Sequence, residues 1–231
     1  MLRRHFIATA PAALIVGTCA VSAIAQSATG SAALPPAAKP PAKSKVAQTI
    51  LVVGDSLSAE YGLRRGTGWV ALLEKRLAKE FAGTTVINAS ISGDTTSGGR
   101  SRLGTLLTQH HPSQVVIELG GNDALRGLAL AMTRDNLGVM VRAAQKAGAR
   151  VLLVGMQMPP NYGAAYATEF AELFASVARE NKAALVPFLL KGVADDADPT
   201  RLFQADRIHP REEAHPMMLE NVWPQLRRLL P

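Results

Sequence analysis

From about Thr49 to the end of the chain, short apolar runs alternate with longer amphipathic stretches. The apolar runs have the length of strands and predict β-strands at residues 50–53, 85–88, 114–119, 150–155 and 184–187. The amphipathic stretches predict helices near residues 68–82, 97–110, 132–147, 163–181 and 212–229. Runs such as Val115-Val116-Ile117 are apolar throughout, which indicates burial on both faces of a sheet. The pattern therefore predicts one three-layer α/β/α domain around a five-stranded, mostly parallel sheet of the flavodoxin-like kind.

The first residues follow a different pattern. Arg3 and Arg4 precede an apolar stretch from Phe6 to Ala25 that closes with Ala23-Ile24-Ala25, as in a secretory signal peptide cleaved after Ala25. A membrane anchor is the alternative, and Pro11 and the high alanine content argue against it. The basic pair also resembles a twin-arginine export signal. We expect a periplasmic or secreted protein, exported by the Sec or the twin-arginine route.

Residues 26–47 are rich in Ala, Pro, Ser and Lys, a composition typical of a flexible or partly extended linker. The predicted organisation is thus a signal peptide at 1–25, a linker at 26–47 and one domain at 48–231. The single cysteine, Cys19, falls in the signal, so the mature protein would have no disulfide, cysteine nucleophile or thiolate metal site. A lipoprotein could use Cys19 as its acylated residue, but Thr18 is bulkier than such sites usually carry.

The chain has 231 residues, of which 48% are hydrophobic and 19% charged, and these values favour a folded domain over a disordered one. The net charge is +7, but the basic residues are scattered and form no nucleic-acid-binding motif. We therefore expect no nucleic-acid partner. The positive balance is compatible with transient contact with an anionic membrane surface.

Glycine-containing turns with small polar residues follow the first three predicted strands. They read Gly54-Asp55-Ser56-Leu57, Ser90-Ile91-Ser92-Gly93-Asp94 and Gly120-Gly121-Asn122-Asp123. In open parallel sheets, ligands bind beyond the carboxyl ends of the strands. Each turn alone is weak evidence because these are ordinary turn residues, but together they indicate a site at this edge.

Ser56 could supply a hydroxyl nucleophile, which needs a base and a group that orients the base. Four of the five histidines fall in the signal peptide or in predicted helices: His5, His110, His111 and His215. His209 remains, and Asp206 lies three residues before it, where a turn would bring the carboxylate to the imidazole. On local sequence alone, Ser56 could equally cap a helix, Asp206 could be a turn residue and His209 a surface residue.

At these residues the sequence resembles the SGNH hydrolase superfamily, also called GDSL esterases and lipases, whose four blocks occur here in order. The resemblance implies that Ser56 is the nucleophile and that Asp206 and His209 complete its triad. It also implies that the Gly93 backbone N–H, the Asn122 side-chain amide and the Ser56 N–H form the oxyanion hole.

Within this superfamily, the segments GDSLSAEYGL, VINASISGDTTSGG, ELGGNDALRG, PPNYG and IHP are similar to a bacterial periplasmic group of acyl-CoA thioesterases, lysophospholipases and arylesterases. The similarity runs from about Thr49 to the C-terminus. In that group the loop after the fourth strand lines the acyl channel, which implies that Met158 and Pro159 contact substrate; ordinary loop packing is the alternative. An ordinary α/β-hydrolase is disfavoured because the serine motif reads Gly-x-Ser-x-Ser instead of Gly-x-Ser-x-Gly.

The resemblance implies a serine esterase that cleaves carboxylic esters and thioesters through an acyl-serine, with no metal or cofactor. The expected partner is a small-molecule or lipid ester, and the protein is expected to be a monomer. One alternative is a carbohydrate O-deacetylase of the same fold, although aromatic residues make up only 5% of the chain. The other is a non-catalytic binding protein, but such a protein would lack a block residue and none is missing here.

Overall fold

Five parallel strands form the sheet at the centre of the structure, a computed structural model that describes residues 48–158, 160–198 and 200–231. Their order is β2-β1-β3-β4-β5. The strands are β1 (Gln48–Gly54), β2 (Thr84–Asn88), β3 (Gln114–Glu118), β4 (Arg150–Val154) and β5 (Ala184–Val186). All five predicted strands are confirmed, and all four neighbouring pairs are parallel. The signal peptide and linker predicted at 1–47 lie outside the described residues.

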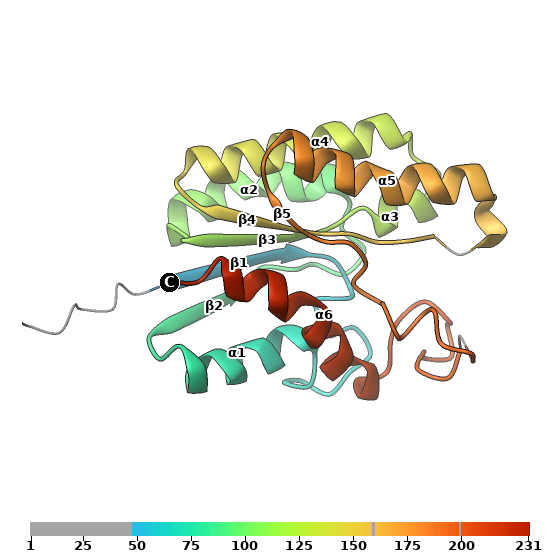
Figure 1. The fold of residues 1–231 in the computed structure, drawn as a ribbon, viewed down its shortest axis with the longest axis horizontal. Helices are drawn as coiled ribbons and strands as arrows, with labels where there is room; N and C mark the ends of the chain where they lie inside the picture. The colour runs from blue at the N-terminus through green and yellow to red at the C-terminus, as the bar shows by residue number, and fades with distance from the viewer. Residues whose placement is uncertain (1–47, 159, 199) are drawn as a thin grey trace, which may run out of the picture. The chain divides into compact units, whose positions relative to one another are not determined.

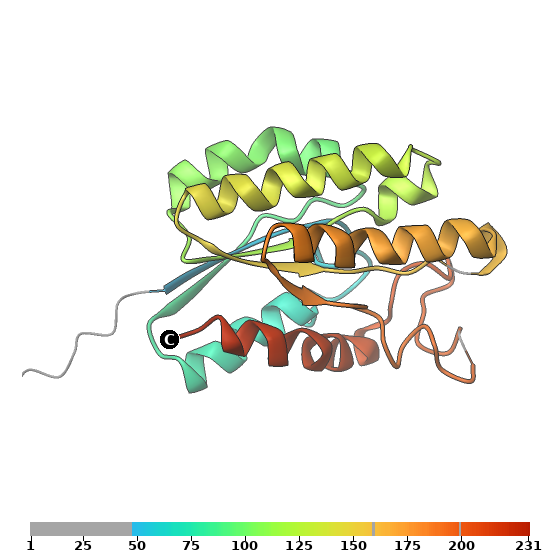
Figure 2. The same cartoon turned by 45° about the horizontal axis from the view of Figure 1, so that its top comes forward.

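Helices cover both faces of the sheet, as the continuously apolar strands require. The helices are α1 (Trp69–Glu80), α2 (Thr96–His110), α3 (Gly121–Leu125), α4 (Leu130–Lys146), α5 (Ala164–Glu180) and α6 (His215–Arg228). Figure 1 shows α2, α4 and α5 on one face and α1 and α6 on the other, and the turned view in Figure 2 keeps this division. The predicted three-layer arrangement is confirmed.

Each covering helix presents an apolar stripe to the sheet. In α1 the buried residues Trp69, Leu73 and Leu77 recur every four positions, so they share one face of the helix. In β1 the run Ile50–Val53 is fully buried between the two helical layers. The core therefore lies on both sides of the central strands and fixes the strand ends rigidly.

The structure differs from the prediction at several helix ends. Helix α3 was not predicted, because five residues beginning with glycine show no helical periodicity. Helix α4 begins at Leu130, two residues before the predicted start. The last predicted helix is two elements, a 3₁₀ turn at Glu212–Ala214 (η2) and then α6. A second 3₁₀ turn, Pro160–Tyr162 (η1), precedes α5. No helix in the described ranges is long and apolar enough to cross a membrane.

Candidate active site

Ser56 lies in the turn that directly follows β1, at the carboxyl edge of the sheet. Two backbone hydrogen bonds close this turn, from the N–H groups of Ser58 (3.2 Å) and Ala59 (2.9 Å) to the carbonyl of Asp55. Ser56 is 9% exposed, so its hydroxyl lies on a rigid and largely covered turn. The turn therefore holds the hydroxyl in one place relative to the neighbouring strand ends.

His209 contacts both Ser56 and Asp206 through opposite nitrogens of its ring. Its Nε2 is 2.9 Å from Ser56 Oγ, and its Nδ1 is 2.7 Å from Asp206 Oδ2. When Nδ1 carries the proton and donates a hydrogen bond to Asp206, the lone pair of Nε2 is free to accept the Ser56 hydroxyl proton. The three residues selected from the sequence therefore form one continuous chain of hydrogen bonds.

A tight turn builds the acid–base pair locally. Asp206 Oδ1 accepts the backbone N–H groups of Ile208 (2.9 Å) and His209 (3.0 Å), which leaves Oδ2 for the imidazole. Arg207 adopts a φ of 57°, in the left-handed region, to make this turn possible. Partial burial raises the pKa of Asp206, but the three hydrogen bonds from Ile208 and His209 outweigh it and lower that pKa to about 2. The carboxylate is therefore ionised at neutral pH.

Gly93 and Asn122 lie at the ends of the strands on either side of β1. Gly93 follows β2 with a φ of 77°, a conformation that favours glycine, and Asn122 lies in the first turn of α3 after β3. Within the described ranges, neither the Gly93 N–H nor the Ser56 N–H has an acceptor. Such free donors beside a nucleophile can stabilise a developing oxyanion.

Asp55, beside Ser56, is a site residue that the sequence analysis left without a role. Its Oδ2 accepts the Asn122 Nδ2 at 2.9 Å, and its Oδ1 accepts the Leu57 N–H at 3.0 Å. One N–H of the Asn122 amide is thus held, and the other remains for a ligand. Burial raises the pKa of Asp55 to about 6, despite these two hydrogen bonds and the nearby His209.

Glu118, the last residue of β3, is a second residue without a predicted role. It is 1% exposed, and its Oε2 accepts the Ser58 hydroxyl at 2.7 Å and the Asp55 N–H at 3.4 Å. Burial and the neighbouring Asp55 carboxylate raise the pKa of Glu118. Through these two hydrogen bonds, Glu118 supports the turn that carries Ser56. An acidic residue directly after the apolar run Val115-Val116-Ile117 was the sequence signal that could have revealed it.

Tyr61 packs against the imidazole of His209. The two ring centroids are 4.3 Å apart and the planes are inclined by 40°. Tyr61 is 50% exposed and Ile208, beside His209, is 48% exposed, so apolar surface flanks the hydroxyl. An exposed aromatic side chain and an exposed aliphatic side chain therefore lie next to His209.

The predicted substrate contacts after β4 remain predictions. Met158 is 9% exposed and packs with the hydrophobic core, and Pro159 lies outside the described residues. His215, which the sequence analysis set aside, is the first residue of α6, and its Nδ1 accepts the Trp69 N–H at 3.0 Å. Burial lowers its pKa, so it is a neutral acceptor at the start of α1.

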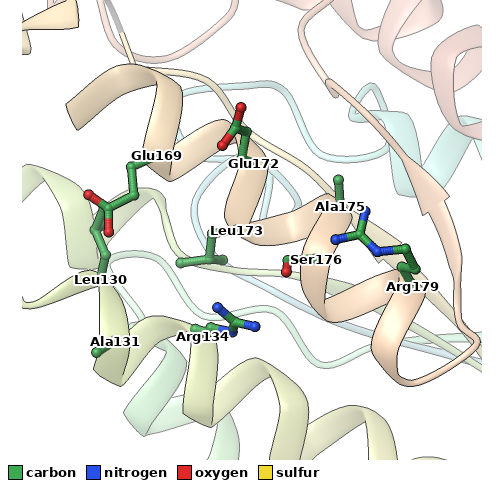
Figure 3. Close-up of a pocket in the computed structure, with 9 residues that line it drawn as sticks. All are labelled: Leu130, Ala131, Arg134, Glu169, Glu172, Leu173, Ala175, Ser176 and Arg179. Atoms are coloured by element: carbon green, nitrogen blue, oxygen red, sulfur yellow. The ribbon is translucent and has the colours of Figure 1, made fainter. Parts of the chain in front are cut away.

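A groove of about 450 Å³ lies away from these residues, between α4 and α5. Figure 3 shows Arg134 and Arg179 on opposite helices near Ser176, with Glu169 and Glu172 farther along α5. None of the predicted site residues lines this groove. Arg134 forms an ion pair with Glu180, so charged side chains line the seam between the two helices. In the described part of the chain, no three His, Cys, Asp or Glu side chains are grouped to hold a metal ion.

Comparison with known proteins identifies one family and several similar proteins. The chain matches the GDSL-like Lipase/Acylhydrolase family over residues 52–216. Esterase TesA of Pseudomonas aeruginosa is 54% identical over 184 residues, which cover 80% of this chain and 90% of the relative. Thioesterase 1/protease 1/lysophospholipase L1 of Escherichia coli K12 is 38% identical over 188 residues, which cover 81% and 88%. The crystal structure of TesA superimposes with a TM-score of 0.76 and covers 79% of this chain and all of that one.

The matched range includes every block that the sequence analysis singled out, from Ser56 to His209. Two relatives above 30% identity span most of this chain and most of their own length. The chain therefore belongs to the GDSL-like lipase and acylhydrolase family.

Proposed function

We propose that this protein is an exported serine esterase that hydrolyses carboxylic esters and thioesters through an acyl-serine intermediate. The observation that carries the proposal is the position of His209, within hydrogen-bond distance of both the Ser56 hydroxyl (2.9 Å) and the Asp206 carboxylate (2.7 Å). The names of the relatives, an esterase and a thioesterase with lysophospholipase activity, support the same class of reaction.

In the first half of the reaction, Ser56 Oγ forms a bond to the carbonyl carbon while His209 Nε2 takes the hydroxyl proton. The carbonyl π electrons move to its oxygen, and the Asp206 carboxylate stabilises the imidazolium. When the tetrahedral intermediate collapses, the bond to the leaving oxygen or sulfur breaks and His209 returns the proton to it. Water then attacks the acyl-serine in the same way and releases the acid and free Ser56.

The negative oxygen of each tetrahedral intermediate would be held by the N–H groups of Ser56 and Gly93 and by the free N–H of Asn122. Loss of one such donor typically lowers kcat by ~10²–10³. These steps use only groups of this chain and water.

We favour an ester or a lysophospholipid over acyl-CoA as the physiological substrate, because an exported protein meets little acyl-CoA. Tyr61 and Ile208 support an acyl or aryl substrate, since they give the entrance an apolar wall beside His209. The leaving group would be an alcohol or a thiol that dissociates into solvent.

Labelling with a fluorophosphonate probe tests the nucleophile. The wild type should be labelled, and Ser56→Ala should not. As a matched control, Ser101→Ala removes an exposed hydroxyl in α2 that bonds only to the Gly98 carbonyl, and labelling should persist. Equal labelling of Ser56→Ala and the wild type would contradict the mechanism.

A chain-length series of nitrophenyl esters tests the substrate class. Hydrolysis that persists or rises from acetyl to longer acyl groups agrees with a lipid or aryl ester. A sharp preference for acetyl would support a carbohydrate deacetylase instead. N-terminal sequencing of the protein from the periplasm or medium tests export, with cleavage expected after Ala25.

A further inference from the structure

The two loops that carry the proposed oxyanion donors are joined by Asp123 and Arg126, two residues that follow Asn122. One loop runs from β2 to α2 and contains Gly93, and the other is the turn from β3 into α3. Gly93 has no side chain to fix its position, and its φ of 77° is one of many that glycine can adopt. The direction of its N–H therefore depends on external restraints.

The first connection is buried. Asp123 is 1% exposed, and its carboxylate accepts the Thr96 N–H at 2.9 Å and the Thr96 hydroxyl at 2.5 Å. A further hydrogen bond comes from the Thr133 hydroxyl at 3.3 Å. Because Thr96 begins α2 and follows Gly93 by three residues, Asp123 fixes the far end of the Gly93 loop.

The second connection is at the surface and reaches Gly93 directly. The Arg126 guanidinium donates from Nη2 to the Gly93 carbonyl at 2.7 Å, and the Arg126 backbone N–H donates to the Asn122 carbonyl at 3.1 Å. Within the described ranges, no other residue hydrogen-bonds to both donor residues. Arg126 thus spans the two loops at the point where both donors lie.

We propose that Arg126 is a positioning residue for the oxyanion hole, holding the Gly93 N–H in line with the Asn122 amide. The inference rests on the proposed function and adds a residue to its machinery. The bond to the Gly93 carbonyl restrains ψ of that glycine and, through the short loop, the peptide that carries its N–H. Arginine suits the role because its planar guanidinium keeps a fixed direction toward the carbonyl, whereas a lysine ammonium is a flexible point charge.

The test compares Arg126→Ala, Arg126→Lys and the wild type on an aryl ester and the matching thionoester. Sulfur accepts hydrogen bonds poorly, so thionoester hydrolysis depends less on oxyanion donors. Arg126→Ala should lower kcat for the ester by about 10- to 100-fold, less than the ~10²–10³ expected for loss of a whole donor. KM should change little, and the ester-to-thionoester rate ratio should fall. Arg126→Lys should recover part of that ratio.

Arg134→Ala is the matched control, since it removes an exposed arginine whose ion-pair partner is Glu180, away from the site. Its rate ratio should equal that of the wild type. Binding of an aryl boronic acid, whose adduct with Ser56 places an oxygen in the hole, gives a second readout. It should weaken about tenfold in Arg126→Ala alone.

An unchanged kcat in Arg126→Ala, or equal losses on ester and thionoester, would overturn the positioning role. Either result would leave the proposed function intact if Ser56→Ala is inactive. Full activity of Ser56→Ala would instead overturn the proposed function itself. Circular dichroism of each variant verifies that Arg126, which is exposed, can be replaced without loss of the fold.

Discussion

The carboxylate of Asp55 and the side-chain amide of Asn122 are joined by a hydrogen bond of 2.9 Å between the ends of two neighbouring strands. Asp55, the residue next to Ser56, therefore restrains the side chain of Asn122, which is a proposed oxyanion donor. Asp55 uses its second oxygen for the Leu57 N–H, so both oxygens are needed as acceptors.

Asp55→Asn should therefore impair catalysis. An amide offers one acceptor oxygen where the carboxylate offers two, so either the Asn122 amide or the Leu57 N–H would face another donor. We expect kcat at neutral pH to fall by about 10- to 100-fold with little change in KM. Asp135→Asn, at an exposed site in α4, is the control and should retain full activity. An Asp55→Asn enzyme with wild-type kcat would disprove this role.

The same residue should make stability depend on pH. Burial raises the Asp55 pKa from 3.8 to about 6, so its contribution is fully present below pH 3.8 and is lost as the pH rises through about 6. This difference in pKa between the unfolded and the folded protein corresponds to roughly 3 kcal/mol in the free energy of unfolding. Asp206, whose pKa is lowered to about 2, loses its contribution only at more acidic pH and does not interfere.

Thermal unfolding of the wild type and Asp55→Asn between pH 4 and pH 7 measures this effect. The Tm of the wild type should fall relative to that of the variant as the pH rises. If the Tm of the wild type and that of the variant changed equally with pH, Asp55 would not be the source of the pH dependence of stability.

Gly54, the last residue of β1, should not tolerate a side chain. A Cβ there would lie 2.8 Å from Glu118 Oε2 and 2.8 Å from Ser58 Oγ, inside contact distance of the groups that support the nucleophile turn. Gly54→Ala should cost about 1–3 kcal/mol of stability and reduce activity. Gly104→Ala is the control because nothing lies within 4 Å of its Cβ in α2, and it should stabilise the fold by about 0.5–1 kcal/mol. Chemical denaturation compares the two, and a harmless Gly54→Ala would contradict the packing described here.

The two histidines of the C-terminal region should separate catalysis from stability. His209→Ala should lower kcat by at least about 10⁴-fold with little effect on unfolding, because it removes the base from a partly exposed position. His215→Ala should destabilise the fold by about 2–4 kcal/mol, since it leaves the Trp69 N–H without its acceptor, yet retain activity. Esterase assays and denaturation of both variants test the contrast. Loss of activity in a folded His215→Ala protein would refute it.

The strands could be predicted because their signals are local, whereas the triad candidates Ser56, Asp206 and His209 were singled out through the resemblance of four separate blocks to one superfamily. Each strand contains a short apolar run, and Asp206 and His209 are three residues apart in a single turn. Helix α3 could not be predicted, since a helix of five residues is too short to show a period. Its formation directs Asn122 toward Asp55, and it directs Asp123 and Arg126 toward Thr96 and Gly93.

The hydrogen bonds that support the candidate site also could not be predicted from the sequence. The pairs Glu118–Ser58, Asp55–Asn122 and Arg126–Gly93 each connect different strand ends, and their formation depends on the sheet order and on the register of β1 with β3. Residue types at the ends of strands indicate that a site exists, but which side chains meet there follows only from the packed sheet.

The hydrogen bond between Ser56 and His209 joins positions 153 residues apart in the sequence. The acid–base turn closes on itself through the Gln204 N–H and the His209 carbonyl, 2.8 Å apart, so it can form without the nucleophile. All five strands precede this turn along the chain, and a polypeptide that ends after β5 would hold the complete sheet but no base. Ester hydrolysis by the proposed triad therefore requires the C-terminal segment to pack beside the sheet, and formation of the sheet alone does not supply the base.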